Sequence, residues 1–235
     1  MRRYAIACLA LIAVLQTPSL GAPPTGTRID RGGSGLTSRH QPVINDSARQ
    51  GVNTYLRCSA ALNVSRAVKI LDEAYRSEDQ LALADDFIPS TSWAVDQKAD
   101  CFSNFGSVEM RYGAESLIGA LAEYFIEVQF DEQDIDGIAT LSSDDWKSDG
   151  LFPRNASESL GMCVGEAKTR LVYELAKTVP DSDAEKAIIG QIVPALSPCL
   201  PDKMEAQFNA TSLRSILVYG LYRILTQSKA ARQQL

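Results

Sequence analysis

The sequence has 235 residues, of which 45% are hydrophobic and 22% are charged, and its formal net charge is −6. This length and composition provide for one sizeable core or two small ones, and they exclude an intrinsically disordered chain. The negative charge, with lysine and arginine scattered along the chain, argues against binding to nucleic acid or to an anionic membrane surface.

Residues 1–21 have the order of segments typical of a secretory signal peptide. A basic start precedes an apolar run at residues 5–15, and Ser19 and Gly21 fit a cleavage site before residue 22. The run is too short to span a bilayer, which needs about 20 apolar residues, although an uncleaved anchor is the alternative. Removal of the leader takes away two arginines and changes the formal charge from −6 to −8. We expect a periplasmic or secreted protein with no integral membrane segment in the mature chain.

Residues 22–44 are rich in Gly, Pro, Ser and Thr and have no apolar period, which predicts a disordered N-terminal tail. This tail contains His40, the one histidine of the chain. Catalysis and metal binding need fixed geometry, so we assign no catalytic or metal role to His40.

Helix signals follow over residues 45–130. Asn63 is expected to cap a helix that begins at Val64, and Ser77 to Gln80 has the Ser-x-x-Gln form of a capping box. The clearest helix is predicted over residues 114–129, because five apolar residues share one face at helical spacing: Leu117, Leu121, Tyr124, Phe125 and Val128.

The rest of the chain is expected to be a linker, a second helical region and a tail. Residues 131–154 are interpreted as an acidic linker loop, 155–228 as helical, and 229–235 as a C-terminal tail. Asn155, Ser182 and Asn209 suit the N-caps of helices. No segment has convincing strand alternation, so the predicted fold class is all-α.

The two helical regions share an order of landmarks. The stretch RCSAALNVSRAVKIL begins at Arg57, and MCVGEAKTRLVYEL begins at Met162. Seven pairs keep their order: Cys58 and Cys163, Arg66 and Arg170, Leu71 and Leu175, Ser77 and Ser182, Cys101 and Cys199, Leu117 and Leu213, Leu121 and Leu217. We predict a helical bundle of two related repeats, residues 45–130 and 155–228.

Four cysteines remain once the leader and Cys8 are removed, which in an exported protein favours two disulfides. Four cysteines allow three pairings. A duplicated unit that carries its own bridge predicts Cys58–Cys101 and Cys163–Cys199. Each would close a loop of roughly 40 residues and remove about 4 kcal/mol of unfolded-chain entropy.

The second region also carries a resemblance. Its CV pair, the arginine-bearing helix, the proline and acidic cap, and the stretches PALSPCLP and SLRSILVYGLYRI resemble uncharacterised small secreted helical proteins of alphaproteobacteria. The resemblance covers mainly residues 155–227 and implies a bacterial periplasmic or secreted setting. It implies no catalytic residue, ligand or cofactor.

No motif for nucleophilic catalysis or zinc is present. A reactive cysteine needs a nearby base, and the cysteines lack the close spacing of zinc ligands. A weak calcium candidate is Glu132, Asp134 and Asp136, which alternate ahead of Gly137 as in an EF-hand loop. Position 12 of that loop is Ser143 rather than a bidentate glutamate.

The carboxylates do not single out an active site. Glu115, Glu123 and Glu127 are expected mostly on the solvated face of their helix, where spacing of one turn is ordinary. Arg66 and Arg170 are expected to be buried arginines that each pair with a carboxylate of their own repeat.

We therefore expect an exported, non-enzymatic helical module that binds a protein or a cell-envelope component, with no cofactor. The alternative is a carboxylate-based hydrolase acting on envelope polymers. A pocket with two facing carboxylates, one of raised pKa, would favour the hydrolase. A shallow apolar groove between the repeats would favour binding.

Overall fold

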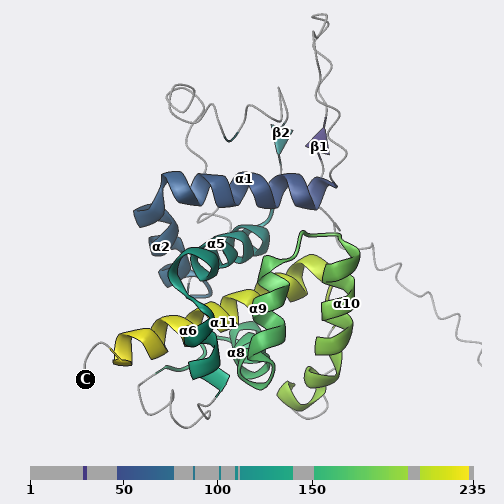
Figure 1. Cartoon of the computed structure of the whole chain (residues 1–235). Coiled ribbons are helices and arrows are strands. Elements are labelled where there is room, and N and C mark those ends of the chain that lie inside the picture. The colour runs from purple at the N-terminus through teal and green to yellow at the C-terminus, as the bar shows by residue number, and fades with distance from the viewer. Residues whose placement is uncertain are drawn as a thin grey trace, which may run out of the picture.

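The computed structural model describes residues 29–30, 47–76, 87, 101, 109–110, 112–139, 151–200 and 207–232. Within these ranges the regular structure is helical apart from one two-residue strand pair, which confirms the all-α prediction (Figure 1). The α-helices are α1 (Ala48–Leu62), α2 (Val64–Glu73), α5 (Ala114–Gln129), α6 (Glu132–Ala139), α8 (Ala156–Ala167), α9 (Thr169–Lys177), α10 (Asp183–Ile192) and α11 (Ala210–Arg232). Two 3₁₀ turns, η1 (Val193–Ala195) and η2 (Ser197–Cys199), follow α10.

The only strands in the described ranges are β1 (Ile29–Asp30) and β2 (Glu109–Met110), which form a two-residue antiparallel pair. No sequence pattern indicated them, because two residues are too few for a period-2 alternation. None of the described helices is both long and apolar enough to cross a membrane.

Side-chain caps fix the starts of several helices. Asn155 Oδ1 accepts a hydrogen bond from the Glu158 amide at 2.9 Å, and Asn209 caps α11 in the same way through the Ser212 amide, at 2.8 Å. Both caps were predicted. A capping box at Ser47, which was not predicted, starts α1.

Single residues separate α1 from α2 and α8 from α9. Asn63 has φ −136° and ψ 53°, and Lys168 has φ −138° and ψ 38°. Each lies five residues after a cysteine, Cys58 or Cys163. Asn63 makes no side-chain cap, which corrects that prediction. Its side-chain amide instead donates to the Ser59 carbonyl at 3.0 Å.

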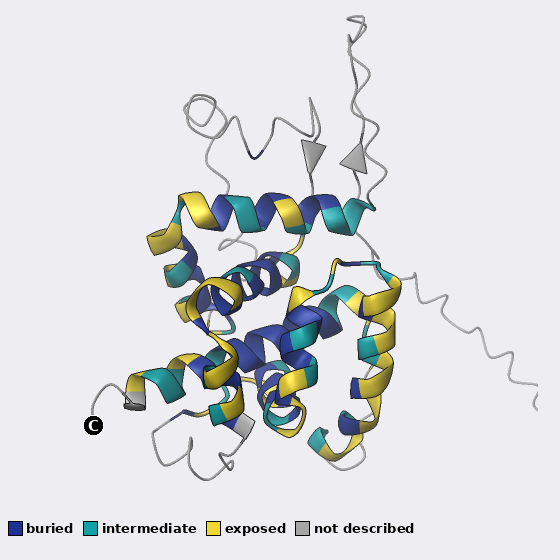
Figure 2. Cartoon of the chain, in the orientation of Figure 1, coloured by how far each residue is buried: buried dark blue, intermediate teal, exposed yellow. Residues whose placement is uncertain are grey.

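The long helix α11 occupies the centre of the core, where it packs most extensively against α8 and then against α5. Figure 2 shows its middle as a buried segment, whereas α10 is mostly exposed. Glycines permit the close crossing of α8 and α11, since a Cβ on Gly161 or Gly220 would overlap the backbone of the other helix. This crossing fixes how α8 sits on the core.

Helices α5 and α11 run parallel over the length of α5. Glu115 accepts a hydrogen bond from Ser212 near the start of both helices. Further along, the rings of Phe125 and Tyr222 lie 6.1 Å apart. At the far end, Lys229 donates to the carbonyl of residue 129 at 2.7 Å. The buried face of α5 includes most of the predicted positions, but Val128 is 55% exposed.

Other boundaries differ from expectation or were not observed. Residues 132–139 of the predicted linker loop form α6, and α11 continues through residues 229–232 of the predicted tail. The acidic segment is helical because Asp131 caps it, accepting from the amides of Gln133 and Asp134. The signal peptide, His40 and the capping box at Ser77 lie outside the described residues.

Candidate functional site

Two disulfides connect the helices to later segments. One joins Cys58 of α1 to Cys101, and the other joins Cys163 of α8 to Cys199 of η2. These are the pairs expected for bridges within each repeat. Cys163 is therefore a structural residue in the described fold and has no thiol available as a nucleophile.

Arg214 of α11 is the centre of a buried polar network, and its side chain is only 4% exposed. Its Nε donates to Glu123 Oε1 at 2.6 Å, and its Nη1 donates to Glu185 Oε1 at 3.1 Å. The guanidinium also donates to the hydroxyl and the carbonyl of Thr178, both at 2.8 Å, beyond the end of α9. Both glutamate side chains are 1% exposed, so Arg214 neutralises buried carboxylates from α5 and α10.

Arg49, in the first turn of α1, brings a second guanidinium to the same network. It donates to both oxygens of Glu185, at 3.0 and 2.9 Å, in a bidentate pair. It also pairs with Asp181, which accepts a further hydrogen bond from Ser47. Burial alone would lower the pKa of Arg49, but the hydrogen bonds and charges of Glu185 and Asp181 outweigh burial and raise it.

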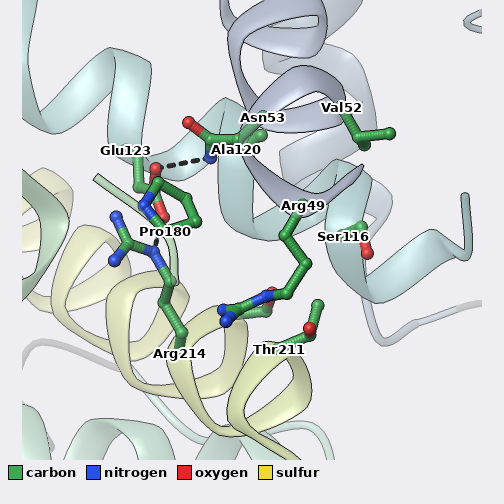
Figure 3. Close-up of a pocket in the computed structure, with 10 residues that line it drawn as sticks. Arg49, Val52, Asn53, Ser116, Ala120, Glu123, Pro180, Thr211 and Arg214 are labelled. Atoms are coloured by element: carbon green, nitrogen blue, oxygen red, sulfur yellow. Dashed lines mark hydrogen bonds and ion pairs between the residues drawn. The ribbon is translucent and has the colours of Figure 1, made fainter. Parts of the chain in front are cut away.

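A small pocket lies beside this network, between α1, α5 and α11 (Figure 3). Its volume is about 30 Å³. A buried water needs roughly 10–15 Å³ of such space, so the pocket has room for a few waters or the tip of one side chain, and a sugar ring is larger than this. The lining residues are Arg49, Val52, Asn53, Ser116, Ala120, Glu123, Pro180, Thr211, Arg214 and Ser215.

Glu123 is the one carboxylate that lines this pocket, and its hydrogen bonds are already made. Oε1 accepts from Arg214, and Oε2 accepts from the Asn53 side-chain amide at 2.8 Å. The expectation that Glu123 is solvated is wrong, because α5 is buried on most of its circumference and Arg214 compensates the charge. Glu115 and Glu127 are exposed, as expected. Both oxygens of Glu123 therefore already accept hydrogen bonds from other side chains.

The acidic calcium candidate does not form a loop. Glu132 and Asp136 lie on α6 and both pair with Arg170 of α9. Asp134 lies 3.8 Å from the Lys229 ammonium group. The prediction of an EF-hand-like loop is therefore wrong, since helical geometry and basic partners direct these side chains elsewhere. The described residues contain no cluster of three or more potential metal ligands.

Arg66 and Arg170 are not the buried arginines that were expected. Arg66 is exposed, and the side chain of Arg170 is 45% exposed. A third buried carboxylate, Glu158, pairs with Arg223, whose Nη1 lies 2.9 Å from Glu158 Oε1. The other carboxylate oxygen accepts from the Arg154 backbone amide at 2.6 Å.

Three residues of the Arg214 network, namely Arg214, Arg49 and Glu185, were not anticipated from the sequence as members of buried ion pairs, and neither was Glu158. One available signal was Arg214 itself, a charge within the apolar helical stretch SLRSILVYGL. Comparisons with protein-family models, with curated proteins and with solved structures found no match to this chain.

Proposed function

We propose that this protein is an exported helical module that binds a protein or a cell-envelope component and does not catalyse a reaction. The observation that carries the proposal is the state of Glu123, which is held by Arg214 and Asn53 beside a pocket of about 30 Å³. A polymer-cleaving hydrolase needs two available carboxylates and a cleft for the chain. Among the described residues, arginines already pair with the buried carboxylates Glu123, Glu158 and Glu185, which supports a role for the helix surfaces.

Exposed apolar side chains provide contact points for such binding. In the described part of the chain, six large ones lie between 45% and 62% exposed: Leu62, Val64, Val128, Phe152, Val179 and Val193. The two disulfides are compatible with the oxidising compartment that export implies. Export also fits the resemblance to secreted alphaproteobacterial proteins.

The proposal includes an internal duplication. The breaks at Asn63 and Lys168 have nearly the same backbone angles, and each follows its cysteine by five residues. At the crossing of α5 with α11, a Cβ on Gly119 would overlap Ser215. The landmark spacing of 96 residues makes Gly119 and Ser215 equivalent. Contact between equivalent residues is what a two-fold arrangement of related units produces.

A reciprocal exchange of arginines supports the same idea. Arg49 and Arg154 are 105 residues apart, as Cys58 and Cys163 are. Arg49 binds Asp181, beyond the end of α9 in the second unit. Arg154 donates to the Ala74 carbonyl, at the end of α2 in the first unit, at 2.6 Å. Arg49 thus stabilises a helix end in the second unit, and Arg154, which directly precedes the second unit, stabilises a helix end in the first.

In-cell photo-crosslinking tests the binding function. A photoreactive amino acid replaces Phe152, Val179 or Val193 one at a time in the full-length protein, in cells that export it. We expect a discrete adduct from at least one position. Glu73, whose side chain is 46% exposed and already pairs with Lys69, serves as a background position. The proposal would be contradicted if none of the three positions gave an adduct that is absent when the photoreactive residue is placed at Glu73.

A further inference from the structure

A group of arginines lies at the start of α8, outside the pocket described above. The buried carboxylate of Glu158 pairs with the Arg223 guanidinium and accepts a hydrogen bond from the Arg154 backbone amide. The Glu158 side chain is 0% exposed, and that of Arg223 is 15% exposed. Glu158 can neutralise only one of the two guanidiniums. The excess positive charge in a partly buried position is costly unless an anion compensates it.

Arg154 is fixed in place and still has donors to offer. Its Nη1 donates to the Ala74 carbonyl at 2.6 Å and to the Tyr219 hydroxyl at 3.1 Å. The Tyr219 hydroxyl in turn donates to the Leu71 carbonyl at 2.9 Å. A guanidinium carries five N–H donors, and these contacts use only Nη1. The remaining donors are held on a rigid support.

A third guanidinium, that of Arg76, adds to the group from the turn after α2. Arg76 is exposed, and among the described residues its side chain has no ion pair. Burial lowers the pKa of Arg154, and the positive charges of Arg223 and Arg76 lower it further, although Tyr219 and Glu158 oppose them. Arg154 donates to the carbonyl of Ala74, which lies two residues before Arg76 in the chain, so the two arginines lie close together in the fold.

Two other carboxylates, Glu115 and Asp72, raise the pKa values of tyrosines in this part of the core. Burial raises the pKa of Tyr75, and the negative charge of Glu115 contributes most after burial. Burial also raises the pKa of Tyr222, and the negative charge of Asp72 raises it further. Among the described residues, neither carboxylate forms an ion pair with Arg76, Arg154 or Arg223.

An exposed apolar residue, Phe152, closely precedes Arg154 in the chain. Phe152, two residues before Arg154, is 62% exposed, the highest value among the large apolar side chains described. A segment that presents a carboxylate next to an apolar side chain would satisfy both features. Nucleic acid and anionic membranes are disfavoured, because the chain as a whole carries −6 and repels extended polyanions.

We propose that Arg76, Arg154 and Phe152 form a docking site for an acidic segment of a partner protein, with a carboxylate on the arginines and an apolar side chain on Phe152. The site deepens the binding function proposed above and rests on it. Glu158 acts as a positioning residue, since its carboxylate accepts a hydrogen bond from the Arg154 backbone amide. Bidentate carboxylate recognition is what the planar guanidinium favours.

A peptide titration of the full-length oxidised protein tests this site. The probes are an octapeptide of alternating glutamate and leucine, the same peptide with glutamine for glutamate, and inorganic phosphate. Chemical shifts of the arginine side-chain N–H groups report binding. We expect saturable binding of the glutamate peptide and at least 10-fold weaker binding of the glutamine peptide and of phosphate. Phosphate binding as tight as the glutamate peptide would overturn the acidic-segment assignment.

Variants localise the effect. Arg76→Ala is expected to weaken peptide binding about 5-fold, and Phe152→Ser by a similar factor. Arg66→Ala is the matched control, because Arg66 is an exposed arginine near the other end of α2. Equal weakening by Arg66→Ala and Arg76→Ala would indicate unspecific charge attraction and would overturn the proposal.

Crosslinking separates failure of this site from failure of the function. A partner captured through Val193 but not through Phe152 leaves the binding function standing and rejects the docking site. Loss of the Phe152 adduct in the Arg76→Ala protein supports the site, and an unchanged adduct rejects it.

Discussion

Arg214 and Glu123 form an ion pair of 2.6 Å in which the two side chains are 4% and 1% exposed. The pair joins α11 to α5, the two helices that run side by side through the core. Removing one member of a buried pair leaves an uncompensated charge, which costs about 3–5 kcal/mol. This makes the network a structural element with large consequences for stability.

Arg214→Ala should therefore destabilise the protein by about 3–5 kcal/mol, measured by urea unfolding. Arg57→Ala is the matched control, because its partner Glu127 is 59% exposed and exposed pairs contribute about 1 kcal/mol or less. Similar losses in both variants would show that the Arg214 network contributes no more than a surface pair.

Two glycines are expected to respond in opposite directions to alanine. Gly220→Ala places a Cβ against the Gly161 backbone and should destabilise the fold by about 1–3 kcal/mol or more. At Gly190, inside α10, no atom lies within 4 Å of the position that a Cβ would take. Gly190→Ala should stabilise the fold by about 0.5–1 kcal/mol. Thermal unfolding of the two variants is the measurement, and a stabilising Gly220→Ala would refute the close crossing.

Acid sensitivity should depend on Asp181. Burial would raise the pKa of Asp181, but hydrogen bonds from Ser47 and Arg49 and the charges of Arg49 and Lys186 lower it on balance. A lowered folded-state pKa means stability that is fully present above the unfolded value of about 3.9. It is lost as the pH falls through the lower folded value.

Asp181→Asn should thus be less stable than the wild type at neutral pH and should lose less stability on acidification below about pH 4. Asparagine suits this position because Asp181 has φ 64°, in the left-handed region that it tolerates. Urea midpoints between about pH 2 and 7 span the range in which a carboxylate titrates. Parallel curves for the two proteins would mean that Asp181 does not titrate as described.

The disulfide pairs are open to direct mapping. Non-reducing proteolysis should release peptides that link Cys58 to Cys101 and Cys163 to Cys199. Loss of the second bridge in a Cys163→Ala, Cys199→Ala protein should cost about 2–4 kcal/mol, since its cysteines are 36 residues apart. A peptide that links Cys58 to Cys163 or Cys199 would contradict the described fold.

Calcium should not bind at α6. Arg170 pairs with Glu132 and Asp136, and Asp134 lies near Lys229, so calcium would have to displace these partners and unfold the helix. Calorimetry with millimolar calcium should detect no heat of binding, and a saturable heat that disappears in Asp136→Asn would restore the calcium site.

Local signals in the sequence were sufficient for much of the fold. The caps at Asn155 and Asn209 and the apolar period of α5 each depend on residues within a few positions, and they were predicted. Glu132 to Ala139 was misread because the same acidic residues suit a loop or a capped helix. The local cap by Asp131 and the ion pairs with the distant Arg170 both favour the helix.

The candidate site was harder to predict for the same reason. Glu123 looked like a surface residue because its partner Arg214 is 91 positions away in the chain. Arg49 and Glu185 are 136 positions apart. Only tertiary packing brings such pairs together, and no local sequence pattern predicts which residues will pair. Arg214 within an apolar stretch was the one sign of a buried charge.

The central claim is that the protein acts by binding through its surface while Glu123 has a structural role. The most direct measurement is photo-crosslinking from Phe152 in cells that export the protein, in wild-type and Glu123→Gln backgrounds. We predict a discrete adduct in both backgrounds, reduced only in proportion to the amount of folded Glu123→Gln protein. No adduct from Phe152, Val179 or Val193, together with an envelope-hydrolysing activity that Glu123→Gln abolishes, would contradict the claim.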